Sequence, residues 1–279
     1  MSLTDIGEIK SIMSRHGFNT SKALGQNFLI NPTVCPRMAE AVCTESCGII
    51  EIGPGIGVLT RELSKKAKKV IAIELDTRLI PILKETLWDC KNVTVINGDV
   101  MKADLKEIIA ESFEGLDVAV CANLPYYITT PVIMRLLEER LPIKTIVVMV
   151  QKEAAQRLIS PPGVRDCGAI SSAVFNYCVP ETLFPVSHGS FMPAPKVDSA
   201  VIKLSVLETP QITNNSELVF KIIKAAFSQR RKRAVNSISS LLGISKAQLE
   251  SAFSEAEVSI NERAEQITLD QWKKIAEKL

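Results

Sequence analysis

The stretch Ile49-Ile-Glu51-Ile-Gly53-Pro-Gly55-Ile-Gly57 decides the fold, because a short apolar run there meets a cluster of glycines. The run is typical of a buried strand, and the glycines allow a tight turn with close approach of a ligand to the backbone. Residues 57–66 then show helical spacing. The order Gly-x-Gly-x-Gly differs from the Gly-x-Gly-x-x-Gly of dinucleotide-binding proteins. Taken alone, these glycines also fit a generic strand–helix turn.

Four more apolar runs alternate with helical patterns: residues 69–74, 93–96, 116–121 and 145–150. Such strands indicate a parallel sheet covered on both faces, with right-handed crossovers, and hence a doubly wound, Rossmann-like α/β fold. Residues 179–186 and 197–206 flank a proline-rich segment and predict an antiparallel hairpin at one edge of the sheet. Helical patterns alone follow residue 216, at 218–227, 234–242, 246–253 and 269–279. We predict a sheet domain with an N-terminal segment over 1–208 and a small all-helical domain over 209–279.

The composition is that of an ordinary globular protein, with 279 residues, 46% hydrophobic, 23% charged and a net charge of +2. The N-terminus lacks a signal-peptide pattern, and no apolar run reaches the roughly 20 residues of a membrane span. We therefore expect a cytoplasmic protein with no membrane partner. The seven cysteines include no Cys-x-x-Cys pair, and His16 and His188 are the only histidines. This predicts reduced, mostly buried cysteines and no metal site.

Acidic residues follow the second and third predicted strands. Glu74 lies 21 residues after Gly53, where a carboxylate can accept hydrogen bonds from the two hydroxyls of a ribose. Asp99 follows the next strand and could accept from the exocyclic amine of an adenine. Singly, each acid could be a surface residue. Together with Gly53 and Gly55 they predict an adenosine pocket at the carboxyl edge of the sheet.

The segment Asn123-Leu124-Pro125-Tyr126 directly follows the fourth predicted strand. It resembles the Asn/Asp-Pro-Pro-Tyr loop of S-adenosylmethionine-dependent methyltransferases that alkylate exocyclic amino groups. The resemblance implies that the glycine turn holds the methionine part of the cofactor, with Glu74 on its ribose and Asp99 on its adenine. The delocalised lone pair of an adenine N6 is a poor nucleophile. Acceptors at the Asn123 amide and the Leu124 carbonyl would hold this nitrogen pyramidal, with Tyr126 stacking on the base. A turn with a packed tyrosine is the alternative.

Three further segments narrow the resemblance: residues 24–29, 191–201 and 227–236. With the Asn-Leu-Pro-Tyr loop, they resemble the KsgA/RsmA family of small-subunit ribosomal RNA adenine dimethyltransferases, from about residue 19 to the end. The resemblance implies N6,N6-dimethylation of two adjacent adenosines, in the loop of the 3′-terminal hairpin of 16S ribosomal RNA within the small subunit or its precursor. It makes Asn27 and Leu29 contacts of an N-terminal lid and Phe191 a second aromatic wall around the adenine. Alternatively, Asn27 is a helix cap and Phe191 a core residue.

Basic side chains are concentrated in two stretches without acids, residues 9–39 and 221–248. Such runs are often only solvated faces, but two of them in a nearly neutral chain fit phosphate contacts beside a pocket. The predicted RNA contacts are Lys22, Arg230, Arg231, Lys232 and Arg233. The Arg230–Arg233 run departs from the family pattern while keeping its charge.

Several alternatives remain open at this point. The chain could methylate adenine N6 in DNA or in large-subunit ribosomal RNA, or it could be a mainly non-catalytic ribosome-assembly factor. A nicotinamide-dependent dehydrogenase is disfavoured by the glycine spacing and by the lack of a candidate proton relay. We expect a monomer.

Overall fold

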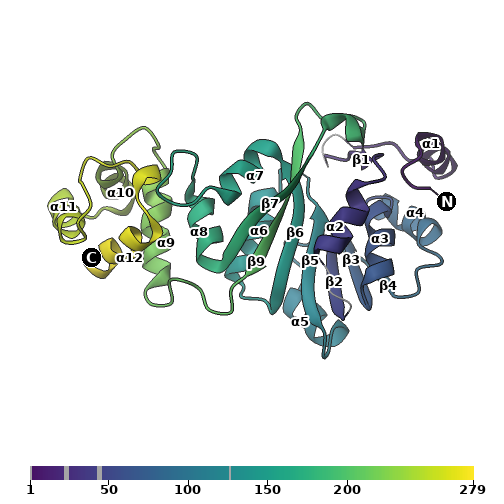
Figure 1. Cartoon of the computed structure of the whole chain (residues 1–279), viewed down its shortest axis with the longest axis horizontal. Coiled ribbons are helices and arrows are strands. Elements are labelled where there is room, and N and C mark those ends of the chain that lie inside the picture. Colours follow the sequence, from purple (N-terminus) through teal and green to yellow (C-terminus); the bar gives the residue numbers. More distant parts are fainter. Residues whose placement is uncertain (1, 22–24, 43–45, 126) are drawn as a thin grey trace. The chain divides into compact units, whose positions relative to one another are not determined.

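The computed structural model describes residues 2–21, 25–42, 46–125 and 127–279. The chain divides into two compact units, shown with their elements labelled in Figure 1. The sheet unit contains residues 1–155 and 181–206, and the helical unit contains residues 156–180 and 207–279. Residues 156–180, which lie within the predicted span 1–208, therefore group with the C-terminal helices.

A seven-stranded sheet forms the centre of the sheet unit, in the order β4-β3-β2-β5-β6-β9-β7 (Figure 1). The strands are β2 (Cys47–Ile52), β3 (Lys69–Glu74), β4 (Val93–Asn97), β5 (Asp117–Asn123), β6 (Ile143–Gln151), β7 (Cys178–Val186) and β9 (Ser199–Val206). The pairs from β4 to β6 are parallel, whereas β9 runs antiparallel to β6. This confirms the predicted doubly wound sheet. Its order changes direction between β2 and β5, which is where ligands bind in such folds.

Helices cover the sheet because its strands are apolar on both faces: every residue of β2 is buried. The helices of this unit are α1 (Ile6–Arg15), α2 (Val34–Val42), α3 (Val58–Lys66), α4 (Ile80–Thr86), α5 (Leu105–Ser112) and α6 (Thr129–Glu138), with short 3-10 turns η1 (Thr77–Leu79) and η2 (His188–Ser190). One core cluster joins Met38 of α2 and Leu63 of α3 to Ile49, Cys121 and Met149 of the sheet.

A second, two-stranded sheet joins β1 (Phe28–Leu29) to β8 (Phe191–Met192). The strands are antiparallel, and Leu29 pairs with Phe191. The backbone N–H of Ile30 donates to the Ser190 carbonyl at 2.8 Å, which extends the pairing. The predicted edge strands appear as β7 and β9, which are neighbours at one edge of the seven-stranded sheet, whereas Phe191 in the segment between them pairs with β1 in this second sheet. The residue instead ties the N-terminal segment to the region of the cavity.

The helical unit has a core of its own. Its helices are α8 (Ala169–Tyr177), α9 (Ser216–Phe227), α10 (Ala234–Leu242), α11 (Lys246–Glu255) and α12 (Leu269–Glu277), with the 3-10 turn η3 (Ala264–Gln266), and α7 (Lys152–Ile159) runs into it from the sheet unit. The predicted C-terminal helices are confirmed to within a few residues. Fully buried Trp272 and Phe253 meet edge to face in the core, with ring centroids 6.3 Å apart.

The cysteines and the lengths of the helices test two expectations drawn from the composition. Five cysteines, Cys35, Cys90, Cys121, Cys167 and Cys178, are free thiols. Cys47 is disulfide-bonded, so the expectation of uniformly reduced cysteines is wrong there. In the described part of the chain, no helix combines the length and apolar character needed to cross a membrane.

Candidate functional site

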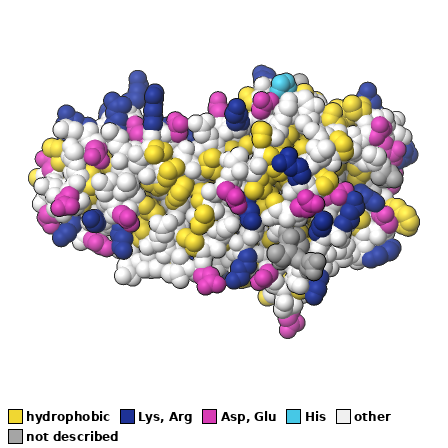
Figure 2. All heavy atoms as spheres, in the orientation of Figure 1, with side chains coloured by type: hydrophobic (Ala, Val, Ile, Leu, Met, Phe, Trp, Pro, Cys, Tyr) yellow, Lys and Arg dark blue, Asp and Glu magenta, His cyan; other side chains and the backbone are white. Residues whose placement is uncertain are grey.

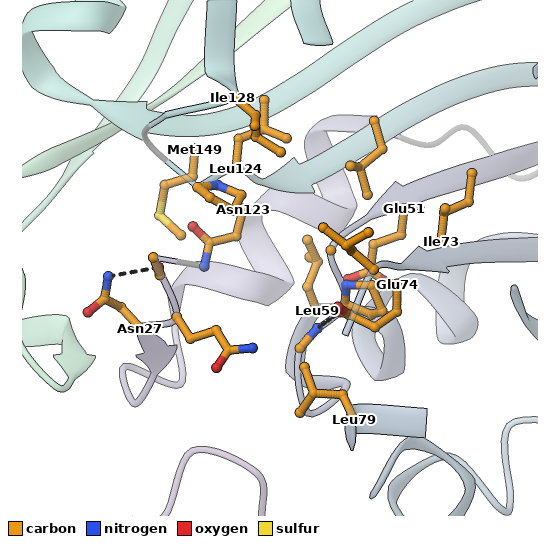
Figure 3. Close-up of a pocket in the computed structure, with 18 of the residues that line it drawn as sticks. Asn27, Glu51, Leu59, Ile73, Glu74, Leu79, Asn123, Leu124, Ile128 and Met149 are labelled. Atoms are coloured by element: carbon orange, nitrogen blue, oxygen red, sulfur yellow. Dashed lines mark hydrogen bonds between the residues drawn. The ribbon is translucent and has the colours of Figure 1, made fainter. Parts of the chain in front are cut away.

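A cavity of about 270 Å³ lies at the carboxyl edge of the sheet (Figure 3). The register explains its position, because Ile52 pairs with Ile73 on one side and with Ala122 on the other. Gly53, Glu74 and Asn123 therefore follow at one level on adjacent strands. The predicted site residues that line this cavity are Asn27, Leu29, Gly53, Gly55, Glu74, Asp99, Asn123, Leu124, Pro125 and Phe191. Tyr126 lies outside the described residues.

The glycine turn has the backbone geometry that only glycine adopts without strain. Gly53 and Gly55 have φ values of 69° and 60°, in the left-handed region. The Gly53 N–H donates to the Ile73 carbonyl at 3.0 Å, which ties the start of the turn to β3. A Cβ on Gly55 would stand 3.7 Å from the Phe28 ring, so the N-terminal segment lies against the turn. The turn therefore brings backbone into the cavity wall without side chains that would fill it.

Glu74 is buried at the end of β3, and its carboxylate is held by backbone donors. The Gly55 N–H donates to Oε2 at 3.2 Å (Figure 3). The Asp76 N–H donates to Oε1 at 2.8 Å. Burial raises the pKa of this carboxyl, and the two N–H donors oppose the rise. A carboxylate has capacity for about four hydrogen bonds, so Glu74 can accept two more from a ligand.

Asp99 is fixed by the loop that follows β4. Its Oδ1 accepts a hydrogen bond from the Met101 N–H at 2.9 Å, which leaves the second oxygen available. Arg135 of α6 braces the same loop by donating to the Val100 carbonyl and, at 2.7 Å, to the Ala103 carbonyl. Glu139 holds the Arg135 guanidinium at 2.5 Å. Sequence patterns did not reveal Arg135, because a lone arginine on a helix looks like any solvated cation.

Asn123 ends β5 with its amide pointing into the cavity (Figure 3). Among the described residues the amide has no hydrogen-bond partner, so both its oxygen and its nitrogen are available to a ligand. The Leu124 N–H donates to the Met149 carbonyl at 3.2 Å, and the Ile128 N–H donates to the Pro125 carbonyl at 3.1 Å. These bonds hold the loop in a defined turn after the strand.

Glu51 also lines the cavity, and sequence reasoning did not assign it a role. Only 1% of its surface is exposed, and Oε2 has no hydrogen-bond partner in the described part of the chain. Burial raises the pKa of Glu51 to about 8, and the negative charge of Glu74 adds to the rise. An acid within the apolar run Ile49-Ile-Glu-Ile was the available signal, because buried acids are rare unless they are paired.

The charged side chains that line the cavity are all acidic among the described residues. Among its described lining residues, Glu51, Glu74 and Asp99 are acidic, and none is lysine, arginine or histidine. S-adenosylmethionine carries a sulfonium and an ammonium group, so the carboxyl of Glu51, with its unpartnered Oε2, and its acidic neighbours fit this cofactor. A dinucleotide would place its pyrophosphate among three carboxyl groups with no described cation beside it.

The predicted RNA contacts lie mainly in the helical unit, in the turn between α9 and α10. Arg231, Lys232 and Arg233 are exposed there. Arg230 donates to the carbonyls of Arg165 and Cys167 at 2.6 and 3.2 Å, so it also braces a loop of its own unit. Figure 2 shows lysine and arginine side chains gathered over the upper edge of this unit. Lys22 lies outside the described residues.

The chain is similar in sequence to a family of known proteins and to named relatives. The family described as "Ribosomal RNA adenine dimethylase" matches residues 17–279. "Ribosomal RNA small subunit methyltransferase A" of Alkaliphilus metalliredigens is 47% identical, over 94% of this chain and 93% of the relative. The protein of the same name from Bacillus pumilus is 45% identical, over 96% and 94%.

The fold is also similar to those of solved structures. A dimethyladenosine transferase from Plasmodium falciparum is similar with a TM-score of 0.71 and 26% identity, covering 88% of this chain and 95% of that one. The 23S rRNA methyltransferase ErmE is similar with a TM-score of 0.69 and 26% identity, covering 91% and 99%.

Proposed function

Because this chain belongs to the ribosomal RNA adenine dimethylase family, we propose that its cavity brings S-adenosylmethionine to the N6 atoms of two adjacent adenosines in 16S ribosomal RNA. These adenosines lie in the loop of the 3′-terminal hairpin, within the small subunit or its precursor. The product is N6,N6-dimethyladenosine, and the modification belongs to small-subunit biogenesis in the cytoplasm. The protein acts as a monomer.

One observation carries the assignment of the cavity: three carboxyl groups and an unpartnered amide meet there, with no basic side chain among the described lining residues. Acids at Glu51, Glu74 and Asp99 suit a cationic nucleoside and disfavour a pyrophosphate. Asn123 lies at the end of β5, beside β2, where its amide oxygen can accept a hydrogen bond from an exocyclic amine. A nicotinamide dinucleotide could use an acid at Glu74 for its ribose, but its pyrophosphate would meet three carboxyl groups and no basic side chain among the described lining residues.

S-adenosylmethionine supplies an electrophilic methyl group when it is bound. The residues of the chain bind and orient the cofactor. Glu74 accepts from the ribose hydroxyls, Asp99 accepts from the adenine amine, and Glu51 neutralises the ammonium group of the methionine part. Asn123 and the Leu124 carbonyl accept the two hydrogens of the target N6 and direct its lone pair. Phe191 and Tyr126 form the walls around the target base. Positioning of this kind is a large source of catalytic rate.

Mapping of methylated bases tests the proposal. The protein is incubated with labelled S-adenosylmethionine and, separately, with immature small subunits, large subunits or adenine-containing DNA. We expect label on two adjacent adenosines of 16S ribosomal RNA only. Label on 23S ribosomal RNA or on DNA would support the corresponding alternative, and stable particle binding without label would support a non-catalytic assembly factor.

The raised pKa of Glu51 predicts that cofactor affinity depends on pH. A bound cation favours the carboxylate, so binding below pH 8 must displace the proton that the empty protein holds there. Affinity should therefore rise from about pH 6 to about pH 7.5, below the roughly 7.7–8.0 at which an α-amino group loses its own proton, with proton release detectable by calorimetry in buffers of different ionisation enthalpy. Glu51→Gln should bind more weakly and lose the pH dependence. An unchanged pH dependence in this variant would show that another group titrates.

The same pKa predicts a trend in stability. Between the ordinary value of 4.5 and about 8, the folded chain holds a proton that the unfolded chain has lost, so stability should fall as pH rises through this window. Thermal unfolding of the cofactor-free protein checks this: Glu51→Gln should melt higher than the parent at pH 8, with a smaller difference near pH 5.

The exposed basic residues in the turn between α9 and α10 predict how substitutions there change the salt dependence of RNA binding. Neutralising Arg231, Lys232 and Arg233 should weaken binding to small subunits and flatten its salt dependence by about 0.7–0.9 log units for each phosphate that the protein no longer neutralises. Arg230 is left in place because it braces residues 165–167. Cofactor affinity should not change.

A matched control removes three positive charges elsewhere on the helical unit, at Lys273, Lys274 and Lys278. This variant carries the same change in net charge, so it should keep the parental salt slope if the α9–α10 turn binds the RNA backbone. Equal slopes for both variants would place the phosphate-binding residues elsewhere.

A further inference from the structure

We propose that Tyr127 is a stacking platform for the nucleobase adjacent to the target adenine, at the rim of the cavity. The inference rests on the proposed function, and it assigns a specific part of the RNA to a residue beyond the Asn-Leu-Pro-Tyr segment. Tyr127 lines the cavity, yet 53% of its surface is exposed. It therefore belongs to the site and to the solvent-facing surface at once.

Two hydrogen bonds to the Pro125 carbonyl fix where Tyr127 lies. Pro125 and Ile128 close a turn, because the Ile128 N–H donates to the Pro125 carbonyl at 3.1 Å. The Thr129 hydroxyl donates to the same carbonyl at 3.3 Å, and α6 begins at that residue. Tyr127 thus lies in a turn held between the end of β5 and the start of α6.

The N-terminal segment lies against the same loop. A Cβ built on Gly25 would stand 3.5 Å from Pro125 Cβ and 3.9 Å from Tyr127 Cδ1. Gly25 has a φ of 61°, so the segment approaches the loop with a backbone conformation that suits glycine. The segment therefore lies near the ring, while about half of the Tyr127 surface stays open to a partner.

The chemistry of the substrate supplies that partner. A target adenine that enters the cavity leaves its neighbour without a stacking partner, because the two bases can no longer lie on each other. An exposed aromatic ring at the rim can replace the missing stacking, as aromatic side chains do in many single-stranded RNA sites. A ring that served the target base itself would face inward and be buried, as Phe191 is at 4% exposure.

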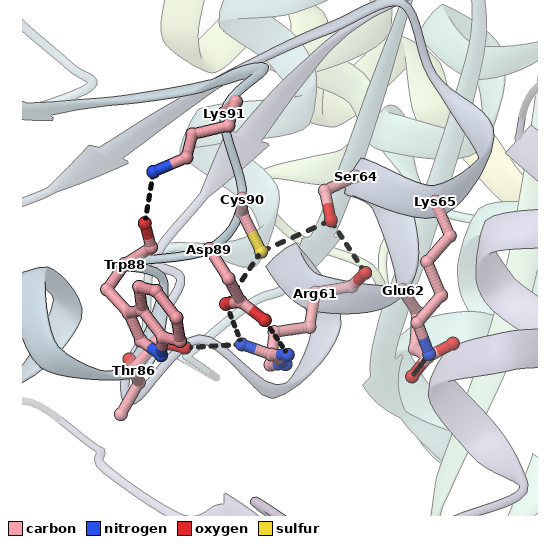
Figure 4. A network of polar contacts seen from close by, with 9 residues as sticks. All are labelled: Arg61, Glu62, Ser64, Lys65, Thr86, Trp88, Asp89, Cys90 and Lys91. Carbon is pink, nitrogen blue, oxygen red and sulfur yellow. Dashed lines mark hydrogen bonds and ion pairs between the residues drawn. The ribbon is translucent and has the colours of Figure 1, made fainter. Parts of the chain in front are cut away.

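Another exposed aromatic residue provides a matched control. Trp88 is 70% exposed but does not line the cavity. Its loop is held by Arg61, which forms two hydrogen bonds with Asp89 at 2.7 and 2.8 Å (Figure 4). Truncating Trp88 therefore removes an exposed ring from a braced loop without touching the site.

The test compares Tyr127→Ala, Tyr127→Phe and Trp88→Ala on immature small subunits. Tyr127→Ala should lower kcat/KM for the subunits about tenfold or more, the effect expected for removing one base-stacking ring, with cofactor affinity unchanged. Tyr127→Phe keeps the ring and should behave like the parent, as should Trp88→Ala. Equal activity of Tyr127→Ala and the parent would overturn the inference. Equal reductions in Tyr127→Ala and Tyr127→Phe would overturn it too, since they would assign the effect to the hydroxyl.

A binding measurement separates this inference from the proposed function. RNA hairpins carry the fluorescent base 2-aminopurine either at the target position or at the adjacent one, and are titrated with cofactor-free protein. Tyr127→Ala should lose the quenching at the adjacent position and keep it at the target position. The reverse pattern would make Tyr127 a wall for the target base and overturn the inference. Absence of methyl transfer by the parent would instead reject the proposed function, and the fluorescence would still decide the role of Tyr127.

Discussion

Asn123→Ala should lower kcat by roughly 10²–10³-fold, equivalent to about 3–4 kcal/mol, by analogy with the loss of one preorganised hydrogen-bonding group from a transition-state site. The amide points into the cavity at the end of β5 without a partner among the described residues (Figure 3). In the proposed function its oxygen accepts a hydrogen from the target N6, and we expect this bond to matter most as the nitrogen becomes pyramidal. The loss therefore falls on the transition state, with RNA binding maintained by phosphate contacts.

Single-turnover rates on saturated small subunits measure this effect. Asn123→Asp keeps an acceptor oxygen at the same place, so its rate should lie between those of the parent and the Ala variant. Cofactor affinity should fall only modestly in either variant, because Asn123 borders that part of the cavity. Parental rates in the Ala variant would reduce Asn123 to a turn residue.

Glu74→Ala should weaken cofactor binding by about 1.5–3 kcal/mol, or about 10- to 150-fold in Kd. The carboxylate is buried at the end of β3 and holds the N–H groups of Gly55 and Asp76. The Ala variant removes the acceptor for the ribose hydroxyls and leaves these two backbone donors without their partner. A lower melting temperature should therefore accompany the weaker binding.

Glu74→Gln separates the two effects. Its amide oxygen can keep one backbone donor, so this variant should recover part of the stability while still binding the ribose less well than the parent. Calorimetric titration with S-adenosylmethionine and thermal unfolding are the two measurements. If the folded Ala variant binds with parental affinity, Glu74 only braces the glycine turn.

Most of the fold can be predicted from local pattern. Short apolar runs predict β2 to β6, and they are clearest in β2, β3, β5 and β6, where a strand buried on both faces has no polar alternation. The edge strand β4 is partly exposed and is predicted from its short Val-Thr-Val-Ile run. The parallel arrangement then places the ends of these strands at one edge, so Glu74, Asp99 and Asn123 meet in one cavity although the first and the last are 49 positions apart in the sequence. The helical spacing of apolar residues likewise predicts the four C-terminal helices.

The remaining features depend on packing between distant segments, which local sequence does not encode. The β1–β8 pair joins two-residue strands, Phe28–Leu29 and Phe191–Met192, which are far too short for a periodic pattern and far apart in the chain. Likewise, the burial of Glu51 and its unpartnered oxygen follow from packing. Arg230 belongs to a basic run in the sequence, but in the fold it donates to two carbonyl groups.

A crystal structure of the protein with S-adenosylhomocysteine, the product of methyl transfer, tests the central claim most directly. The claim is that the cavity at the carboxyl edge of β2, β3 and β5 holds the cofactor with its sulfur toward Asn123. The predicted result is a ribose whose hydroxyls donate to the Glu74 carboxylate, an adenine amine beside Asp99 and an amino group near Glu51. A ligand bound elsewhere, or one turned so that its sulfur faces away from Asn123, would contradict the account.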